Sequence, residues 1–247
     1  MILKKSLGQH FLKDDSVSQR IVAALRQQPF TQLLEVGPGA GALTKHLVQL
    51  PGINFKAVEI DDEKIPYLQK TFSQLQLIHE SFLDMEPPFE GPFSIIGNFP
   101  YNISTEILFK TLGWKDQVQM IVGMFQKEVA ERIAAPPGSK IYGVTSVLLQ
   151  AFYKVEYLFD VPPSSFNPPP NVMSGVIRLL PVENQLAIKS ERSFRVLVKT
   201  AFNQRRKMLR NAVKSLFSAE ILQQPIFDKR AEQLSKEDFA ALTFQMT

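Results

Sequence analysis

Residues 33–44 read LLEVGPGAGALT. An apolar run ends at Val36, and Gly37, Gly39 and Gly41 then alternate with other residues before a segment whose apolar spacing suits a helix. Glycines at such a turn let the backbone approach a ligand closely and direct the start of a helix toward it. The stretch therefore predicts a ligand-binding turn at the carboxyl end of a strand in a parallel α/β sheet.

The glycine spacing leaves the ligand open. A dinucleotide fold prefers Gly-x-Gly-x-x-Gly, and its tolerant form accepts alanine as the last residue, where this chain has Ala42. A strand-to-helix turn can also need glycines for structural reasons alone. These glycines therefore do not separate a nucleotide-dependent dehydrogenase from a methyltransferase.

Apolar runs alternate with amphipathic segments beyond this turn. The pattern predicts strands at residues 32–37, 54–60, 75–79, 93–99 and 118–125, and helices at residues 41–50, 62–74, 104–113, 126–135 and 142–153. Residues 154–162 and 172–181 are expected to pair as an antiparallel edge, and the pattern is helical after Glu191. We therefore expect a mostly parallel sheet with helices on both faces in residues 1–182, and a small all-α domain in residues 183–247.

The composition narrows the chemistry. The 247 residues include no cysteine and three histidines, none of them in a His-x-x-x-His pair. Disulfides, thiolate sites and a cysteine nucleophile are therefore excluded, and no metal site is expected. No apolar stretch reaches the length of a membrane span, and charges stand where a signal peptide has its apolar core. A cytoplasmic location without membrane contact is predicted.

Carboxylates follow the next two predicted strands. Glu59 lies 18 residues beyond Gly41, close to the roughly 20 expected for a carboxylate that binds ribose hydroxyls. Asp84 is placed to accept from an adenine amino group, although a surface turn carboxylate fits the spacing nearly as well. Together with the glycines they predict an adenosine-shaped site, and a free ribose diol is common to NAD and S-adenosylmethionine.

The fourth predicted strand leads into GNFPYNIS at residues 97–104. Asn98 offers a side-chain carbonyl, Phe99 a backbone carbonyl whose direction Pro100 helps to fix, and Tyr101 a flat face. Two acceptors and a stacking surface suit an exocyclic adenine amine that attacks an activated methyl group. Without the upstream motifs, an ordinary turn with Tyr101 packed on the core would be the favoured interpretation of this stretch.

At this point the chain resembles a known family. The motifs SLGQHFL, LLEVGPGAGALT, VEID, SFLDM, GNFPYNIS, MFQKEVAERI and SFNPPPNVMSGVIRL occur in the order seen in ribosomal RNA adenine N6-dimethyltransferases. The later AFNQRRKMLRNAV and RAEQLSKEDFAAL look like the C-terminal domain of the KsgA (RsmA) branch. The resemblance implies a Rossmann-like class I methyltransferase fold and the cofactor S-adenosylmethionine.

The branch resemblance also implies a substrate. Its members dimethylate two adjacent adenosines in a hairpin near the 3′ end of small-subunit (16S) rRNA, within an assembling 30S-type particle. We therefore expect an enzyme that is coupled to small-subunit maturation and that acts as a monomer without a metal.

The resemblance also implies roles for individual residues at the positions that match the family's motifs. Tyr101 and Phe166 would stack on opposite faces of a flipped adenine, and Asn98 would touch both base and cofactor. From the residues alone, Phe166 is a stacking plate on a proline-stiffened loop or a plug over the core. The other cofactor contacts implied are the main chain of His10 and Leu12, Gly37 and Gly39 at the methionine end, Glu59 at the ribose and Asp84 at the adenine.

Two positions depart from the commonest family pattern. Phe99 replaces a leucine or isoleucine, which leaves the required carbonyl in place. His10 stands where many relatives have asparagine, and a main-chain contact would make that change mild. A titrating role for His10 is not expected.

Positive charge gathers near the C-terminus, where residues 181–247 hold 12 Lys and Arg against 7 Asp and Glu. A helix across residues 194–217 would place several cations in one arc, and a break near Asn203 would rotate its second half away. Such a stripe would face RNA phosphates, although a solvated helical face has the same charge count. The cations assigned to RNA are Arg195, Lys199, Arg205, Arg206, Lys207 and Arg210, with Lys4, Lys5 and Lys13 extending the track.

Three other functions share parts of this pattern. An Erm-type enzyme has the same catalytic motifs but acts on large-subunit rRNA, and the basic C-terminal segment opposes it. A DNA adenine methyltransferase more often has Asp-Pro-Pro-Tyr, whereas this chain has Asn98 in the first position and a single proline. A non-catalytic checkpoint factor of ribosome assembly would keep the whole RNA-binding surface.

Overall fold

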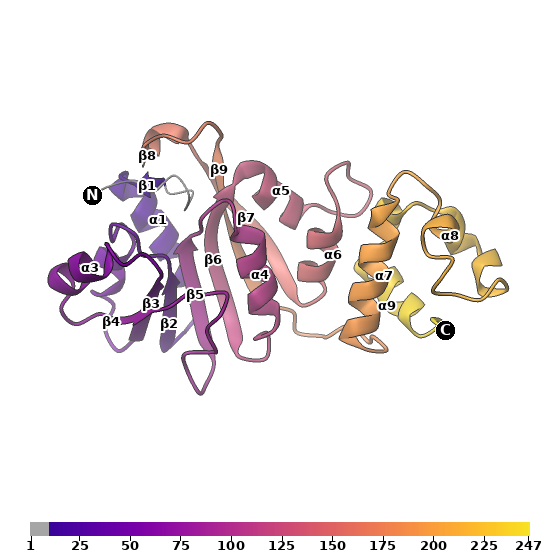
Figure 1. Cartoon of the computed structure of the whole chain (residues 1–247), viewed down its shortest axis with the longest axis horizontal. Coiled ribbons are helices and arrows are strands. Elements are labelled where there is room, and N and C mark those ends of the chain that lie inside the picture. Colours follow the sequence, from indigo (N-terminus) through magenta and orange to yellow (C-terminus); the bar gives the residue numbers. More distant parts are fainter. Residues whose placement is uncertain (1–9) are drawn as a thin grey trace. The chain divides into compact units, whose positions relative to one another are not determined.

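The structure is a computed structural model that describes residues 10–247. It divides into two compact units (Figure 1). The described part of the first unit runs to Ala130 and resumes at Val155–Pro181, and the second unit comprises Glu131–Lys154 and Val182–Thr247. The chain passes from the first unit into the second between Pro181 and Val182, one residue before the boundary expected from the sequence, and residues 131–154 also group with the C-terminal helices.

The first unit is built on a seven-stranded sheet of order β4-β3-β2-β5-β6-β9-β7. The first five of these strands are mutually parallel, and β9 is antiparallel to β6. This architecture confirms the predicted α/β class with a mostly parallel sheet. The strands are β2 (Gln32–Val36), β3 (Asn54–Glu59), β4 (Gln76–His79), β5 (Phe93–Asn98), β6 (Val118–Gln126), β7 (Tyr153–Val161) and β9 (Ser174–Pro181).

The strand order reverses at β2. From β2 the chain continues outward through β3 and β4, and it then returns to the other side of β2 as β5. In open α/β sheets a ligand crevice lies beyond the carboxyl ends of the strands at such a reversal. The topology therefore directs a binding site to the ends of β2, β3 and β5.

Helix α1 (Asp15–Leu25), which the sequence pattern did not predict, packs on one face of this sheet. Asp14 caps it by accepting a hydrogen bond from the backbone N–H of Ser16 at 3.1 Å. Its apolar side, including Ile21 and Leu25, joins a buried cluster with β2 and β6 residues. The remaining helices of this unit are α2 (Thr44–Leu47), α3 (Ile65–Thr71) and α4 (Ser104–Leu112), and α5 (Lys127–Ala134) crosses into the second unit.

A short ribbon stands apart from the large sheet. Strand β1 (Phe11–Leu12) pairs antiparallel with β8 (Phe166–Asn167), with Leu12 opposite Phe166. The backbone N–H of Lys13 extends the pairing by donating to the carbonyl of Ser165 at 2.9 Å. The ribbon follows the 3₁₀ turn η2 (Pro163–Ser165) and ties the start of the described chain to a segment more than 150 residues later.

The second unit is helical. Helix α7 (Glu191–Asn203) buries an apolar side that includes Phe194 and Leu197, and Phe202 contacts the rings of Tyr142 and Phe239 at centroid distances of 6.1 and 6.0 Å. The other helices and 3₁₀ turns are α6 (Val144–Gln150), α8 (Leu209–Ala212), η3 (Ile221–Gln223), η4 (Pro225–Asp228), η5 (Ala231–Gln233) and α9 (Lys236–Thr243).

The basic segment is not one helix. Helix α7 ends at Asn203, and a turn precedes α8, so the possible break near that residue is confirmed.

Among residues 10–247, none of the helices combines the length and apolar character needed to cross a bilayer.

Candidate active site

A cavity of about 280 Å³ opens at the strand ends that the topology singles out. Its walls come from the ends of β2, β3 and β5, the loop after β4 and the β1 segment. All of them belong to the first unit. The predicted site residues that line the cavity are His10, Leu12, Gly37, Gly39, Glu59, Asn98, Phe99, Pro100 and Tyr101.

The glycine turn after β2 requires its glycines for two different reasons. Gly37 has φ of 68°, a left-handed conformation, and a Cβ at this position would meet no atom within 4 Å. Gly39 has φ of 57°, and a Cβ there would lie 3.3 Å from the Phe11 ring. The turn thus presents open backbone at Gly37, while Phe11 of β1 covers Gly39.

Glu59 is the last residue of β3, and its side chain is hydrogen-bonded to this glycine turn. Its Oε1 accepts from the backbone N–H groups of Ile60 and Asp61, both at 3.0 Å, and its Oε2 accepts from the N–H of Gly39 at 3.2 Å. The side chain is buried. A carboxylate held by three backbone donors has a fixed direction, which suits it to receive a pair of ribose hydroxyls.

Glu35 is a second carboxyl group in the cavity wall, and it was not among the predicted site residues. It lies within β2 at 1% exposure and accepts a 2.7 Å hydrogen bond from the Thr44 hydroxyl. Burial, followed by the nearby charge of Glu59, raises its pKa from 4.5 to about 8. The sequence feature that could have identified Glu35 is a charged residue inside the apolar run LLEV.

Asp84 lies outside the cavity lining. The residue is exposed, and its backbone N–H donates to the carbonyl of Ser81 at 3.0 Å in the turn after β4. Ser81 and Phe82 line the cavity in its place. Strand β4 ends at His79, so the first residues beyond the strand reach the pocket, and the later carboxylate turns away.

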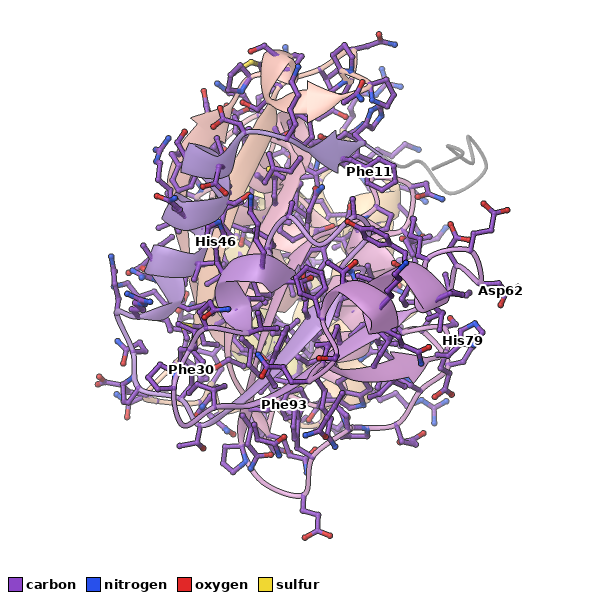
Figure 2. All side chains as sticks on the ribbon, turned by 90° about the vertical axis from the view of Figure 1, so that its left-hand side faces the viewer. Phe11, Phe30, His46, Asp62, His79 and Phe93 are labelled. Carbon is purple, nitrogen blue, oxygen red and sulfur yellow. The ribbon has the colours of Figure 1, made fainter. Side chains whose placement is uncertain are left out.

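The two other histidines are also away from the cavity. His79 pairs with Asp62 at 2.8 Å and His46 with Asp15 at 2.7 Å, both through Nε2. In the view of Figure 2, His46 lies to the left of Phe11, and Asp62 and His79 lie together at the lower right. Among the described residues no group of three or more His, Cys, Asp or Glu side chains is arranged to hold a metal ion.

The end of β5 carries the second half of the site. The Asn98 side-chain amide donates through Nδ2 to the carbonyl of His10 at 3.1 Å, which leaves its Oδ1 available as an acceptor. The Tyr101 hydroxyl shares a 2.5 Å hydrogen bond with the hydroxyl of Ser174 on β9. Burial raises the pKa of Tyr101, so the phenol stays protonated at neutral pH.

The Phe99 ring fills a space that two glycines leave open. A Cβ on Gly97 would lie 2.6 Å from this ring, and a Cβ on Gly123 would lie 2.4 Å from it. The ring also meets Phe125 edge-on at a centroid distance of 5.1 Å. The backbone of Phe99 is thereby fixed beside the cavity, with its N–H donating to the carbonyl of Met124 at 3.2 Å.

Phe166 does not line the cavity. It is 1% exposed and belongs to the buried cluster that also contains Leu12 and Val176. Its pairing with Leu12 in the ribbon holds the ring inward. In this structure Phe166 occupies the position of a plug over the core, which was the alternative to a stacking plate.

The predicted RNA-binding cations fall into two groups. Arg195 and Lys199 are exposed on α7, and Arg206 and Lys207 are exposed in the turn that follows. The other two are engaged within the second unit. Arg205 donates to the carbonyl of Lys140 at 2.5 Å, and Arg210 forms an ion pair with Asp228. The break after Asn203 therefore divides the expected stripe.

Comparison with known proteins identifies the family. The family model described as "Ribosomal RNA adenine dimethylase" matches residues 2–246. The chain belongs to this family. Members of the ribosomal RNA adenine dimethylase family are S-adenosylmethionine-dependent enzymes, and the chain is accordingly an rRNA adenine dimethyltransferase that uses this cofactor.

Relatives of this dimethylase extend over nearly its whole length. Proteins named "Ribosomal RNA small subunit methyltransferase A" are 53% identical in Cytophaga hutchinsonii, covering 97% of this chain and 95% of the relative, and 46% identical in Porphyromonas gingivalis, covering 97% and 96%. A dimethyladenosine transferase structure from Plasmodium falciparum superposes with a TM-score of 0.77 at 25% identity, covering 93% and 94%. The 23S rRNA methyltransferase ErmE shares the fold, with a TM-score of 0.70 at 21% identity and coverage of 95% and 100%.

The dimethylase cavity suits its cofactor. Glu59 is buried beside the glycine turn, and its fixed carboxylate would have the position to accept a pair of ribose hydroxyls. Phe82 and Leu83 add apolar surface for a purine.

Proposed function

We propose that this dimethylase acts on small-subunit rRNA and converts two adjacent adenosines, in a hairpin near the 3′ end, to N6,N6-dimethyladenosine. The observation that carries this proposal is the Asn98–Tyr101 segment, whose amide oxygen and aromatic ring border the cofactor cavity. The choice of subunit is supported by relatives that are 46–53% identical and are named for the small subunit.

The side chains around Asn98 prepare the target amine for reaction. We assign Asn98 Oδ1 and the carbonyl of Phe99 to accept the two N–H groups of the adenine N6 amine. Two acceptors favour the pyramidal amine, whose lone pair is directed out of the ring plane. Tyr101 supports one face of the base, and Pro100 restricts the backbone between the acceptors and the ring.

S-adenosylmethionine supplies a methyl group already activated on a sulfonium, so the transfer needs neither a metal nor a strong base. The N6 lone pair would form the new N–C bond as the S–C bond of the cofactor breaks, and the amine would then lose a proton to solvent. The residues of this chain therefore contribute mainly by positioning the amine against the methyl group. After the first transfer one N–H remains, and one acceptor is enough to orient the monomethylated amine.

The remaining cavity residues are assigned to the cofactor. The backbone at Gly37 and Gly39 would meet its methionine portion, Glu59 its ribose, and the main chain of His10 and Leu12 would close over it. We assign the adenine contact to Ser81 and not to Asp84, because Ser81 lines the cavity and Asp84 does not.

RNA would be held by exposed cations. Arg195, Lys199, Arg206 and Lys207 are free of the internal contacts that engage Arg205 and Arg210, and they face solvent where phosphates can approach. The expected Lys4 and Lys5 contacts lie outside the described residues. Binding to an assembling 30S-type particle, a monomeric state, a metal-free reaction and a cytoplasmic location belong to the same proposal.

A methyl-transfer assay tests the proposal. The protein is incubated with labelled S-adenosylmethionine and, separately, with undermethylated small subunits, large subunits and duplex DNA. The expected product is N6,N6-dimethyladenosine from small subunits alone, identified by mass spectrometry. Label on large subunits or DNA instead would refute the assigned substrate. Binding of small subunits without any transfer would favour an assembly checkpoint.

Asn98→Ala separates chemistry from docking in the same assay. We expect it to abolish most transfer while small-subunit binding persists, because the substitution removes an acceptor at the cavity and no cation of the RNA-binding surface. Loss of both properties would show that Asn98 supports the fold or the docking surface.

A further inference from the structure

We propose that Lys64 is a positioning residue of the cofactor site, whose ammonium group holds the Phe11 ring over the glycine turn. The proposal rests on the assignment of this turn and of Glu59 to S-adenosylmethionine. It deepens that assignment by naming the residue that keeps the site closed and so sets how long the cofactor stays bound.

Lys64 carries a buried charge at the cavity. The residue is 2% exposed and lines the cavity, although lysine is almost never fully buried without a partner. Its Nζ lies 3.4 Å from Oδ2 of Asp61, which is also buried. This distance is longer than that of a usual N–H···O hydrogen bond, so charge attraction dominates the pair. An ammonium group has three donors, and a single long contact leaves it in need of a further partner.

The second partner of this ammonium group is an aromatic face. Lys64 Nζ lies 5.0 Å from the centroid of the Phe11 ring, within the range of about 6 Å for a cation–π contact. Such a contact is stronger when the cation is removed from water, as it is here. Because Phe11 belongs to β1 and Lys64 immediately precedes α3, the contact joins the ribbon to the start of a helix.

The same ring covers the glycine turn. A Cβ on Gly39 would lie 3.3 Å from the Phe11 ring, and the N–H of Gly39 donates to Glu59 at 3.2 Å. A cofactor that meets the Gly39 backbone and the Glu59 carboxylate would therefore lie against this ring. Movement of Phe11 away from Gly39 would open the place assigned to the methionine portion and the ribose.

The two sides of the contact differ in how firmly the backbone holds them. The N–H of Lys64 donates to the carbonyl of Asp61, and the carbonyl of Lys64 accepts from the N–H of Leu68, both at 2.9 Å. The β1–β8 ribbon, in contrast, has only two residues in each strand. An isolated two-stranded ribbon is at best marginally stable in water. Side-chain contacts are therefore needed to keep Phe11 in place, and Lys64 supplies one of them from the more rigid side.

Lys64→Met and Phe11→Leu test the proposal, each measured at a temperature where the proteins are folded. The first variant keeps the unbranched stem and removes the charge, and the second removes the ring face and keeps an apolar side chain. We expect each to raise the Kd of S-adenosylhomocysteine by about fivefold or more, mainly through faster release. The KM for S-adenosylmethionine should rise in proportion, whereas kcat at saturating cofactor should stay within about twofold.

Hydrogen exchange reports the same change in the protein without cofactor. The backbone N–H of Lys13 donates to the carbonyl of Ser165 at 2.9 Å, so it is protected while the ribbon is paired. This amide should exchange about fivefold faster or more in Lys64→Met and in Phe11→Leu. Phe11→Tyr keeps the ring face and should restore most of the protection that Phe11→Leu loses.

Lys56→Met is the matched control. Lys56 Nζ lies 4.7 Å from the centroid of the Phe89 ring in the same unit, but neither residue lines the cavity. This variant should lower Tm, because Lys56 also donates to the carbonyl of Pro88 at 2.7 Å. The Kd of S-adenosylhomocysteine and the exchange of the Lys13 amide should both stay within about twofold of the wild type.

The double variant distinguishes two ways in which Lys64 could act. If Lys64 acts through the ring, Lys64→Met should change the Kd by less than about twofold in the Phe11→Leu background. An equal increase in both backgrounds would show a direct contact with the cofactor and would overturn the positioning role. A lower Tm with an unchanged Kd would also overturn it, because the buried pair would then only support the start of α3. Methyl transfer to large subunits would refute the proposed function without changing these binding measurements.

Discussion

Replacing Glu35 by glutamine should remove most of the pH dependence of stability in the first unit between pH 5.5 and 8.5. The folded pKa is raised to about 8, against 4.5 for the free group, because the carboxyl is buried. Over the interval between these values the unfolded chain has ionised Glu35 while the folded chain still holds the proton. Stability from this group is therefore lost as pH rises through that interval.

The expected magnitude follows from the size of that interval. Each pKa unit corresponds to about 1.4 kcal/mol, so complete ionisation costs roughly 5 kcal/mol, of which roughly 3 kcal/mol falls between pH 5.5 and 8.5. Glutamine has nearly the same shape as the protonated acid and can still accept from the Thr44 hydroxyl. The variant should match the wild type near pH 4.5 and exceed its stability by several kcal/mol at pH 8.5.

Urea unfolding of both proteins at pH 5.5, 7 and 8.5 measures this difference. Trp114 is the one tryptophan of the chain and lies buried in the same unit as Glu35, so its fluorescence reports the relevant transition. Equal pH slopes in the two proteins would refute the buried-acid account. A variant that is less stable than the wild type at pH 8.5 would show that the charged carboxylate stabilises the fold.

Three further predictions concern the reaction and the RNA. Gly123→Ala should lower stability by about 1–3 kcal/mol and reduce methyl transfer, because the new Cβ would lie 2.4 Å from the ring of Phe99 and displace the carbonyl of that residue. An unchanged Tm in a thermal melt would contradict this prediction. Tyr101→Phe should lower stability by about 1 kcal/mol through the lost hydrogen bond of the hydroxyl and keep most of the methyl-transfer rate, whereas Tyr101→Ala should lose most of that rate. Equal transfer rates in the two variants would exclude stacking of the base on Tyr101. Arg195→Ala and Lys199→Ala should each weaken binding to small-subunit rRNA and lower the magnitude of the slope of log K against log salt by about 1, measured by filter binding; an unchanged slope would remove that residue from the RNA surface.

The order of elements was largely predictable because each long apolar run serves a strand that is buried on both faces. Residues 54–60, 93–99 and 118–125 were expected as strands, and β3, β5 and β6 occupy most of them. Helix α1 was not predicted because its apolar positions lie among polar residues, which weakens the helical pattern. The β1–β8 ribbon has only two residues in each strand, too few for a period-two pattern to appear.

The sequence by itself determined the glycine turn, the carboxylate at Glu59 and the Asn98–Tyr101 segment, because each is a local pattern at the end of a strand, and parallel strands bring their carboxyl ends to one edge. Only the tertiary structure decided which residues reach the cavity. Ser81 lines the cavity and Asp84 does not, since the chain turns across residues 81–84, where the N–H of Asp84 donates to the carbonyl of Ser81. Phe166 is buried and the His10 ring faces Tyr101, because the pairing of β1 with β8 joins segments more than 150 residues apart, and no local pattern records such a contact.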